Sequence, residues 1–153
     1  MKLQQITLVA VVLALTSSAF AEGKPEDEIR YRQSVMNVNG RAFGPMAQMA
    51  QDKAPYNKDV VVKNTAIVEM MIGLPWNSFA AGTEKGAPTK ADMKVWSEGA
   101  KFKESAEKSQ KAVTALATAV KGGDEKAIKA AIGDVGKTCK GCHDDFRLKE
   151  FRN

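Results

Sequence analysis

The feature that most constrains this chain is the segment Cys139-Lys140-Gly141-Cys142-His143, which lies close to the C-terminus. It contains the only two cysteines and the only histidine among the 153 residues. On a helix, positions i, i+3 and i+4 share one face, so both thiols and the imidazole reach the same partner. Two thiols at this spacing add to the vinyl groups of a haem, and the histidine that follows coordinates the iron. The segment therefore predicts one covalently attached haem c.

Other uses of these side chains fit the sequence less well. A structural zinc site takes four protein ligands, whereas the cysteines and the histidine supply only three and would need a carboxylate in addition. A thioredoxin-like redox pair is typical of a βαβ pattern, and a structural disulfide is typical of small, loop-rich chains. The helical pattern described below matches neither context.

The first residues predict export from the cytoplasm. A positive charge at Lys2 precedes an apolar stretch over residues 6–15, and Ala19-Phe20-Ala21 matches an A-x-A cleavage site. The apolar stretch is much shorter than the roughly 20 residues that a membrane-spanning helix needs. We therefore expect a signal peptide over residues 1–21, and a mature domain over residues 22–153 that lies in the periplasm without membrane insertion.

Size and charge are those of a single ordinary domain. A mature chain of about 130 residues is long enough to bury a core. The full sequence has a net charge of +5, which becomes +4 without Lys2, and haem propionates lower it further. Because basic residues are scattered among acidic ones, nucleic acid is not an expected partner.

The mature chain is predicted to be all-α. Apolar residues recur at spacings of three and four, and no segment shows convincing strand alternation. The expected helices start near Pro25, after Pro55 with Asn57 as N-cap, at Thr89 as N-cap in a weak capping box with Asp92, and at Asp124. The predicted fold is an antiparallel up-down-up-down four-helix bundle with the haem bound between its helices.

The same spacing predicts the inward face of each helix. The first is expected to bury Ile29, Met36, Gly40 and Phe43, with a kink or interruption at Gly44-Pro45. The second is expected to bury Val60, Ile67, Met71 and Leu74 and to end at Leu74-Pro75. The third is expected to bury Trp96, Phe102, Ala106, Val113, Leu116 and Val120, and the fourth Ile128, Ile132, Val135, Cys139, Cys142 and Phe146. Both cysteines therefore continue the seam that faces the core.

The second axial position of the iron is open to more than one interpretation. Only ten residues follow His143, so an earlier part of the chain must cover the opposite face of the iron. No second histidine exists, which leaves a methionine, a lysine or no ligand. Met36 lies on the inward face of the first helix, and in an antiparallel bundle this helix neighbours the fourth. The other mature methionines are Met46, Met49, Met70, Met71 and Met93.

Three groups of residues carry a resemblance to a known family. They are Tyr31-Arg32-Gln33 with Met36, Leu74-Pro75-Trp76 with Phe79, and Asp134-Val135-Gly136 leading into the haem motif, with Arg147 after it. A haem motif at the C-terminal end, combined with Arg32-Gln33 far upstream, is much more specific than the motif alone. Over essentially the whole mature chain, these residues resemble cytochrome c′, the class II cytochromes c.

The resemblance implies a five-coordinate haem. His143 would be the sole axial ligand, and Met36 would be the apolar side chain over the empty face. Arg32 and Gln33 would line the haem edge near the propionates, and Arg147 would lie beside the proximal face, whereas without the resemblance both arginines could equally form surface ion pairs. The remaining cofactor-binding residues that it implies are Trp76 and Phe79.

Two functions follow, depending on Met36. An open iron implies a haem protein that binds NO or CO, because an apolar distal side chain offers no hydrogen bond to dioxygen. A branch similar to cytochrome c556 ligates iron with this methionine and implies a six-coordinate electron carrier. A peroxidase needs an acid or base above the haem, and the chain has no second histidine to supply one, so no enzyme is expected. The family implies a homodimer through the first two helices, with Val38, Val61, Val62 or Met70 as contacts, alongside a redox partner protein.

Overall fold

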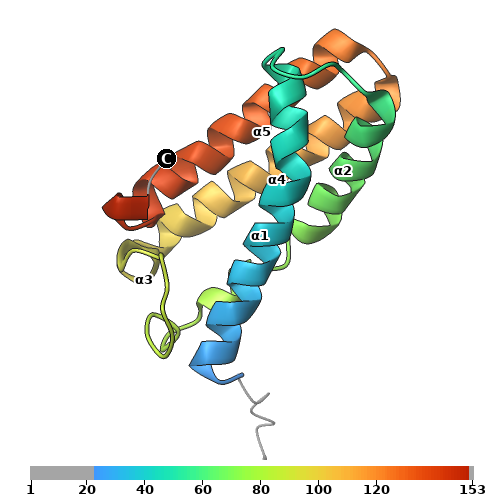
Figure 1. Ribbon diagram of the computed structural model, residues 1–153. Coiled ribbons are helices and arrows are strands. Elements are labelled where there is room, and N and C mark those ends of the chain that lie inside the picture. Colours follow the sequence, from blue (N-terminus) through green and yellow to red (C-terminus); the bar gives the residue numbers. More distant parts are fainter. Residues whose placement is uncertain (1–22, 152–153) are drawn as a thin grey trace, which may run out of the picture.

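The computed structural model describes residues 23–151 and shows an all-helical chain (Figure 1). Four long helices form the bundle: α1 (Pro25–Ala50), α2 (Lys58–Met71), α4 (Gly99–Gly122) and α5 (Glu125–Phe146). Three short elements accompany them: η1 (Trp76–Phe79), α3 (Lys94–Ser97) and η2 (Lys149–Phe151). The only β pairing within residues 23–151 is an isolated antiparallel bridge between Ala91 and Arg147. The predicted all-α four-helix bundle is confirmed, whereas the predicted signal peptide over residues 1–21 lies outside the described residues.

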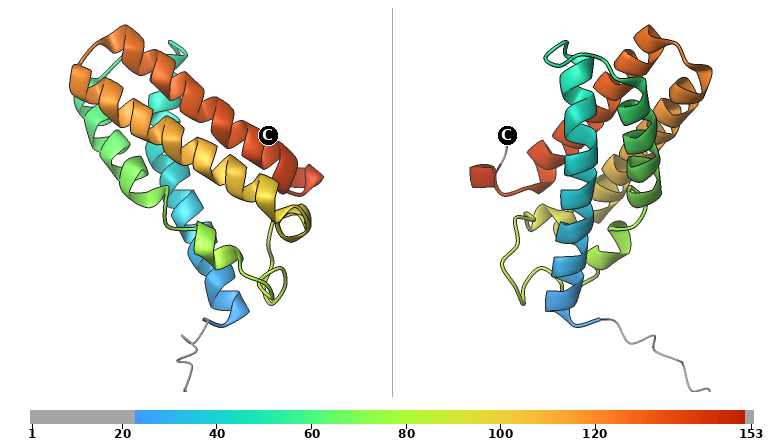
Figure 2. Two further views of the ribbon diagram at one scale, coloured as in Figure 1. Left: turned by 180° about the vertical axis from the view of Figure 1, so that it is seen from behind. Right: turned by 45° about the vertical axis from the view of Figure 1, so that its right-hand side comes forward.

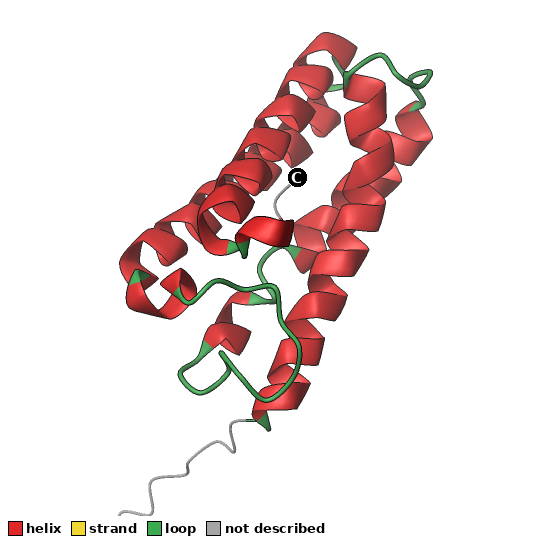
Figure 3. Ribbon diagram, turned by 60° about the vertical axis from the view of Figure 1, so that its left-hand side comes forward, coloured by secondary structure: helices red, strands yellow, loops and turns green. Residues whose placement is uncertain are grey.

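The connections separate the bundle into two ends. The turns between α1 and α2 and between α4 and α5 lie together at one end, and the long connection from α2 to α4 lies at the other (Figure 1). Successive long helices therefore alternate in direction, and α1 and α5 are antiparallel (Figure 2). The connection from α2 to α4 is the longest irregular segment, interrupted by η1 and α3 (Figure 3). None of the helices in the described part combines the length and apolar character that crossing a bilayer requires.

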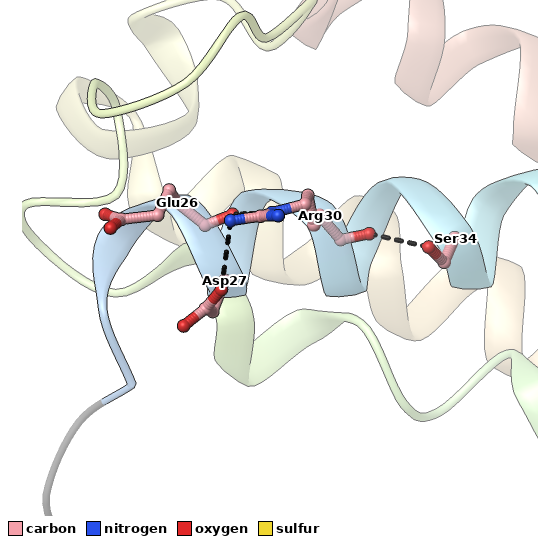
Figure 4. Close-up of polar contacts among 4 residues, drawn as sticks. All are labelled: Glu26, Asp27, Arg30 and Ser34. Atoms are coloured by element: carbon pink, nitrogen blue, oxygen red, sulfur yellow. Dashed lines mark hydrogen bonds and ion pairs between the residues drawn. The ribbon is translucent and has the colours of Figure 1, made fainter.

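The start of α1 is stabilised by local polar contacts on its exposed side. Pro25 occupies the first turn, where its missing N–H costs nothing, and acidic residues follow it. Arg30 donates from Nη2 to Asp27 Oδ1 at 3.2 Å and from Nε to the Glu26 carbonyl at 3.4 Å, and Ser34 Oγ donates to the Arg30 carbonyl at 2.8 Å (Figure 4). Exposed contacts of this kind contribute little to stability, so the buried face of the helix must hold it in place.

Helix α1 continues past a proline within its second half. Of the kink or interruption predicted at Gly44-Pro45, the interruption is wrong, because the helix continues to Ala50 with Pro45 inside it, and the kink stays a prediction. Proline removes one backbone hydrogen bond and crowds the preceding turn. Met46 and Met49 follow immediately and are 0% and 8% exposed, so their burial in the core offsets that loss.

Helix α2 begins as predicted but buries a different stripe. Asn57 is its N-cap and accepts a hydrogen bond from the Val60 amide at 3.1 Å. The helix ends at Met71, three residues before the predicted end. Its fully buried residues are Val61, Thr65 and Val68, whereas the predicted Val60, Ile67 and Met71 are half-buried and Leu74 is 44% exposed. Valines and isoleucine occupy two adjacent faces of this helix, so apolar spacing alone could not select between them.

The predicted third helix is divided in two. Thr89 is not its N-cap: the threonine hydroxyl accepts instead from the Ala91 amide at 3.2 Å. Backbone bonds from Asp92 N to the Phe146 carbonyl (2.8 Å) and from Leu148 N to the Lys90 carbonyl (3.0 Å) tie this segment to the end of α5. Residues 90–92 are therefore held extended, and α3 begins only at Lys94, with a break at Glu98 before α4.

Helix α5 begins where the sequence predicts. Gly123 terminates α4 in the left-handed region at φ 78°, and the Asp124 carboxylate caps α5 by accepting from the Ala127 amide at 2.7 Å. On its inward face the predicted residues Ile128, Ile132, Val135 and Phe146 are buried.

The apolar core fills only one half of the bundle. Its members come from the C-terminal half of α1, from α2, from the second half of α4 and from the first half of α5: Ala42, Met46, Met49, Val61, Val68, Val113, Leu116, Ile128, Ile132 and Val135. Cys139 and Cys142, further along the same stripe of α5, are only half-buried. They border the cavity that occupies the other half of the bundle.

Candidate haem site

A cavity of about 830 Å³ lies between α1, α4, α5 and the long connection. Cofactor and small-molecule sites typically enclose about 300–1,000 Å³, so this volume is suited to a prosthetic group. All of the site residues predicted from sequence line it: Arg32, Gln33, Met36, Trp76, Phe79, Cys139, Cys142, His143 and Arg147. Residues more than 100 positions apart in the sequence therefore meet at one site.

The haem-attachment motif lies on the last turns of α5 and faces this cavity. Cys139 and Cys142 are free thiols, and burial raises the pKa of Cys139 and raises that of Cys142 to about 11. Burial lowers the pKa of His143, and the positive charge of Arg147 lowers it further. The neutral imidazole is the form that binds metals. Within residues 23–151, no group of three or more His, Cys, Asp or Glu side chains is placed to hold a metal ion.

Helices α1 and α5 face each other closely just beyond the cavity. A Cβ atom added at Gly136 would lie 3.6 Å from Cζ of Phe43, so these two positions are opposed. Met36 lies seven residues before Phe43, and His143 lies seven residues after Gly136. Because the helices are antiparallel and each rises about 1.5 Å per residue, Met36 and His143 lie at about the same level on opposite walls.

Met36 is the only methionine of the described part that lines the cavity. The other candidates are elsewhere: Met46 and Met49 lie in the core, and Met70 and Met93 are 75% and 59% exposed. Among the lysines within residues 23–151, Lys90 alone lines the cavity, and its ammonium group lies 4.5 Å from the ring centre of Phe151.

Arg32 is buried and holds the long connection in place. It is 2% exposed, and its guanidinium donates to the Ser78 carbonyl (2.8 Å) and to the Thr83 hydroxyl (2.9 Å) and carbonyl (2.8 Å). A further bond of 3.3 Å reaches the Thr89 hydroxyl, and the guanidinium also stacks 4.5 Å over the Phe79 ring. Burial lowers the pKa of Arg32, but an arginine remains protonated in proteins. The sequence pointed to Arg32 as a site residue but did not reveal this bracing role.

Gln33 and Arg147 add two further ties around the cavity. Gln33 Nε2 donates to the Pro88 carbonyl at 2.9 Å and so fixes the far end of the same connection. Arg147 follows the last turn of α5, where its amide donates to the His143 carbonyl at 3.1 Å, and pairs with Ala91 in the isolated bridge. The end of α5 and the long connection are therefore joined through backbone contacts beside the histidine.

Aromatic rings form a continuous wall on one side of the cavity. Phe79 lies 4.9 Å from Phe102, and Phe102 lies 5.2 Å from Phe146, both as edge-to-face pairs. Trp76 packs on Phe102 at 5.9 Å, and Trp96 packs on Phe79 at 6.3 Å. Phe102 and Phe146 were predicted only as core residues, although Phe146 lies three residues after His143 and so shares its helix face. Such a wall would keep water away from that side of a group bound in the cavity.

Asn39 is a site residue that the sequence did not predict. Asn39 lines the cavity and is 8% exposed, and neither its amide nitrogen nor its amide oxygen has a hydrogen-bond partner. The signal was present in the sequence, because positions 32, 36, 39 and 43 share one helix face.

These observations fit a c-type haem. The cavity has a suitable size, an apolar aromatic wall, two thiols at the attachment spacing, an imidazole beside them and one buried amide without a protein partner. Cys139 and Cys142 would hold the group and His143 would face its iron. A haem supplies an iron centre that binds small ligands or exchanges electrons.

Comparisons with known proteins point to the same group. The family model of cytochrome c′ matches residues 27–147. The cytochrome c′ of Rubrivivax gelatinosus is 47% identical over 126 residues, covering 82% of this chain and 98% of the relative. Its crystal structure superposes with a TM-score of 0.79 at 46% sequence identity, covering 82% of this chain and 98% of that one.

A second set of solved structures shows the same fold with ligands. A ferrous variant of cytochrome c′ from Alcaligenes xylosoxidans with bound NO is 36% identical, with a TM-score of 0.75 and coverage of 84% of this chain and 98% of that one. A variant of the same protein with bound carbon monoxide is 37% identical, with a TM-score of 0.75 and coverage of 83% and 98%. Matches of this extent, together with a haem-attachment motif on the cavity wall, show that the chain is a haem c protein and belongs to the cytochrome c′ family.

Proposed function

We propose that this chain is a periplasmic haem protein with a five-coordinate, high-spin iron that binds NO or CO. The observation that carries the proposal is that a histidine and a methionine line opposite walls of the same cavity. His143 lies on α5, and Met36 lies at about the same level on α1. With a histidine on one side and a thioether on the other, the iron could be five-coordinate or, with the thioether as a second ligand, six-coordinate. Membership of the family favours the five-coordinate iron.

The proposed roles follow from position. Cys139 and Cys142 form the thioether links and His143 is the axial ligand. Arg147 lies beside the proximal face, one turn beyond the histidine. Trp76 and Phe79 cover one side of the macrocycle as part of the aromatic wall.

Arg32 and Gln33 are proposed to act indirectly, by positioning the long connection that lines the cavity. The hydrogen bonds of Arg32 to Ser78 and Thr83 use its guanidinium to position the segment that carries Phe79. Gln33 holds the end of that segment at Pro88. Contact of either residue with the haem propionates stays a prediction.

Gas binding is supported by the chemistry of the distal wall and by the relatives. Met36 itself is an apolar side chain with no N–H or O–H donor, and NO and CO bind ferrous iron without needing one. Variants of the related Alcaligenes protein have been solved with bound NO and with bound CO. The test is to add stoichiometric CO to the ferrous holoprotein and record the optical spectrum. A shift to a ligand-bound spectrum is expected, and an unchanged spectrum would remove the proposal.

The second candidate is an electron carrier in which Met36 ligates the iron. Met36 favours it because it is the only cavity-lining methionine of the described part and lies level with His143. His/Met coordination is common in cytochromes and raises the reduction potential. In that case Met36→Ala converts a low-spin spectrum to high-spin, whereas Met93→Ala, at an exposed methionine, leaves it unchanged. A Met36→Ala spectrum identical to the parent rules out this ligand.

Compartment and partners complete the proposal. Export through a cleaved signal peptide over residues 1–21 would place the protein in the periplasm, with an unidentified protein as redox partner and no enzymatic turnover of its own. We further propose a homodimer through α1 and α2. Tyr31 and Val38, seven residues apart, and Val62 and Met70, eight apart, are 42–75% exposed and form one outward stripe on each helix. Val61, also a predicted contact, is fully buried in the core and takes no part.

A further inference from the structure

Asn39 is the one buried side chain of the described part whose polar atoms are left without a partner. Other buried side-chain hydroxyls are paired: Thr65 Oγ1 donates to Met46 Sδ at 3.4 Å, and Ser109 Oγ donates to the Ser105 carbonyl at 3.0 Å. An unpaired amide in an apolar interior is destabilising, and proteins rarely keep one without a use. Asn39 also lines the haem cavity, so its missing partner is to be sought there.

The position of Asn39 relative to the haem motif can be stated from the helix geometry. It lies three residues after Met36, so both side chains share one face of α1. It lies four residues before Phe43, which opposes Gly136, and by the antiparallel register it is about level with Lys140. That level falls between Cys139 and His143, the two positions that bracket a bound haem. Asn39 is thus on the distal wall, about one turn deeper in the bundle than Met36.

The direction of the amide N–H is adjustable, although both amide atoms are buried. The last side-chain torsion of asparagine is an sp³–sp² bond with a broad energy profile, so the amide plane turns at little cost toward a group that fills the cavity. The residues of α4 and α5 that line the cavity include Ser109 and His143 beside the aromatic and aliphatic ones, but none of them forms a hydrogen bond with the amide of Asn39. A ligand with an acceptor atom, held on the distal face, is then the natural partner for the N–H.

We propose that Asn39 is a specificity-determining residue that donates a hydrogen bond from its side-chain amide to a diatomic ligand on the distal face of the haem. This inference rests on the proposed gas-binding function and refines it. Met36 supplies steric crowding, and Asn39 supplies a single polar contact to the outer atom of the ligand. The distal pocket is therefore not wholly apolar, and it retains acceptor ligands longer than an apolar wall would.

The test uses carbon monoxide on the ferrous holoprotein. We compare the parent with Asn39→Leu, which has the same number and branching of side-chain heavy atoms and no N–H, and with Asn77→Leu at an exposed asparagine of η1 that does not line the cavity. The C–O stretching frequency and the rate of CO release are measured for each. In Asn39→Leu the stretch shifts to higher frequency and release accelerates roughly tenfold, the effect of losing one hydrogen bond. Asn77→Leu matches the parent.

A second measurement needs only the parent protein and so does not depend on any variant folding. Transfer of the parent from H₂O to D₂O shifts the C–O stretch, because the donor is an exchangeable amide. Equal stretching frequencies in the parent and Asn39→Leu, or no D₂O effect in the parent, overturn the inference while gas binding stands. Failure of the ferrous parent to bind CO at all overturns both proposals.

Discussion

At the scale of single residues, Arg32 contributes more than its position in the cavity wall suggests. Its positive charge is buried, and the acceptors of its hydrogen bonds are carbonyl and hydroxyl oxygens of the long connection. Hydrogen bonds to a charged group stabilise more than neutral ones, and leaving their acceptors unpaired is costly. This one side chain therefore decides whether the segment over residues 76–89 keeps its conformation.

Replacement of Arg32 tests that role. Arg32→Ala is expected to lower the free energy of unfolding of the holoprotein by about 3 kcal/mol, since it removes several charge-assisted bonds from a buried site. Arg30→Ala is the control, because Arg30 is exposed and its ion pair with Asp27 is screened by solvent. Denaturant unfolding followed by helical circular dichroism measures both. Equal losses for the two variants would show that Arg32 does not brace this segment.

The sequence predicted most of the residues at the site but not what each one does. The haem motif has a fixed chemistry, so Cys139, Cys142 and His143 could be assigned from the amino-acid sequence alone. Asn39 shares a helix face with Met36 but was not predicted, because helical spacing identifies inward faces by their apolar residues and a polar residue among them is easily missed. The partners of Arg32 lie about 50 positions away along the chain, and no local pattern encodes contacts of that range.

At the scale of elements, helix ends were predictable where local chemistry decides them. Asn57 and Asp124 cap α2 and α5 through their own side chains. The break between α3 and α4 was not predictable, because it depends on backbone bonds from Asp92 and Leu148 to segments distant in sequence. Which face of α2 is buried was likewise not predictable, because it depends on how the neighbouring helices pack against it.

The end of α4 offers a test with an internal control. Gly123 has φ 78°, a conformation that costs an L-residue with a side chain, so Gly123→Ala is expected to lower the free energy of unfolding by about 1 kcal/mol. Gly133 lies inside α5 with open space where a Cβ would be, so Gly133→Ala is expected to raise it by roughly 0.5–1 kcal/mol. Thermal unfolding compares the two variants. The same sign for both would contradict the assigned backbone conformations.

At the scale of the whole molecule, the bundle is divided into a packed half and a haem half. The apolar core occupies the half that contains the short connections, and the cavity occupies the other. A covalently linked haem stays attached when the chain unfolds, but its packing and its iron ligation exist only in the folded state and stabilise that state, and the cavity that would hold it lies at one end. Removal of the haem should therefore loosen the molecule unevenly.

Hydrogen exchange tests this division. In protein prepared without haem, amides in residues 76–98 and 139–151 are expected to lose most of their protection, whereas those in residues 113–120 and 128–135 keep it. Mass spectrometry of the haem-free and holo forms measures the difference segment by segment. Uniform loss over all four segments would show that the core does not stand without the haem.

The proposed dimer is tested at the same scale. Met70→Glu places a charge in the exposed stripe of α2 and is expected to convert the dimer to a monomer in sedimentation velocity. Met93→Glu changes a methionine that is also exposed but lies outside the stripe, and it should leave the dimer intact. A parent protein that sediments as a monomer, or a Met70→Glu variant that stays dimeric, contradicts the proposed interface.

The coordination of one iron atom decides between the two candidate functions, and a resonance Raman spectrum of the ferrous holoprotein reports it directly. We expect a five-coordinate, high-spin haem with His143 as its only axial protein ligand, which changes to a ligand-bound form when CO is added. A six-coordinate, low-spin spectrum that stoichiometric CO leaves unchanged, and that becomes high-spin in Met36→Ala, would contradict the open iron and identify Met36 as the second ligand.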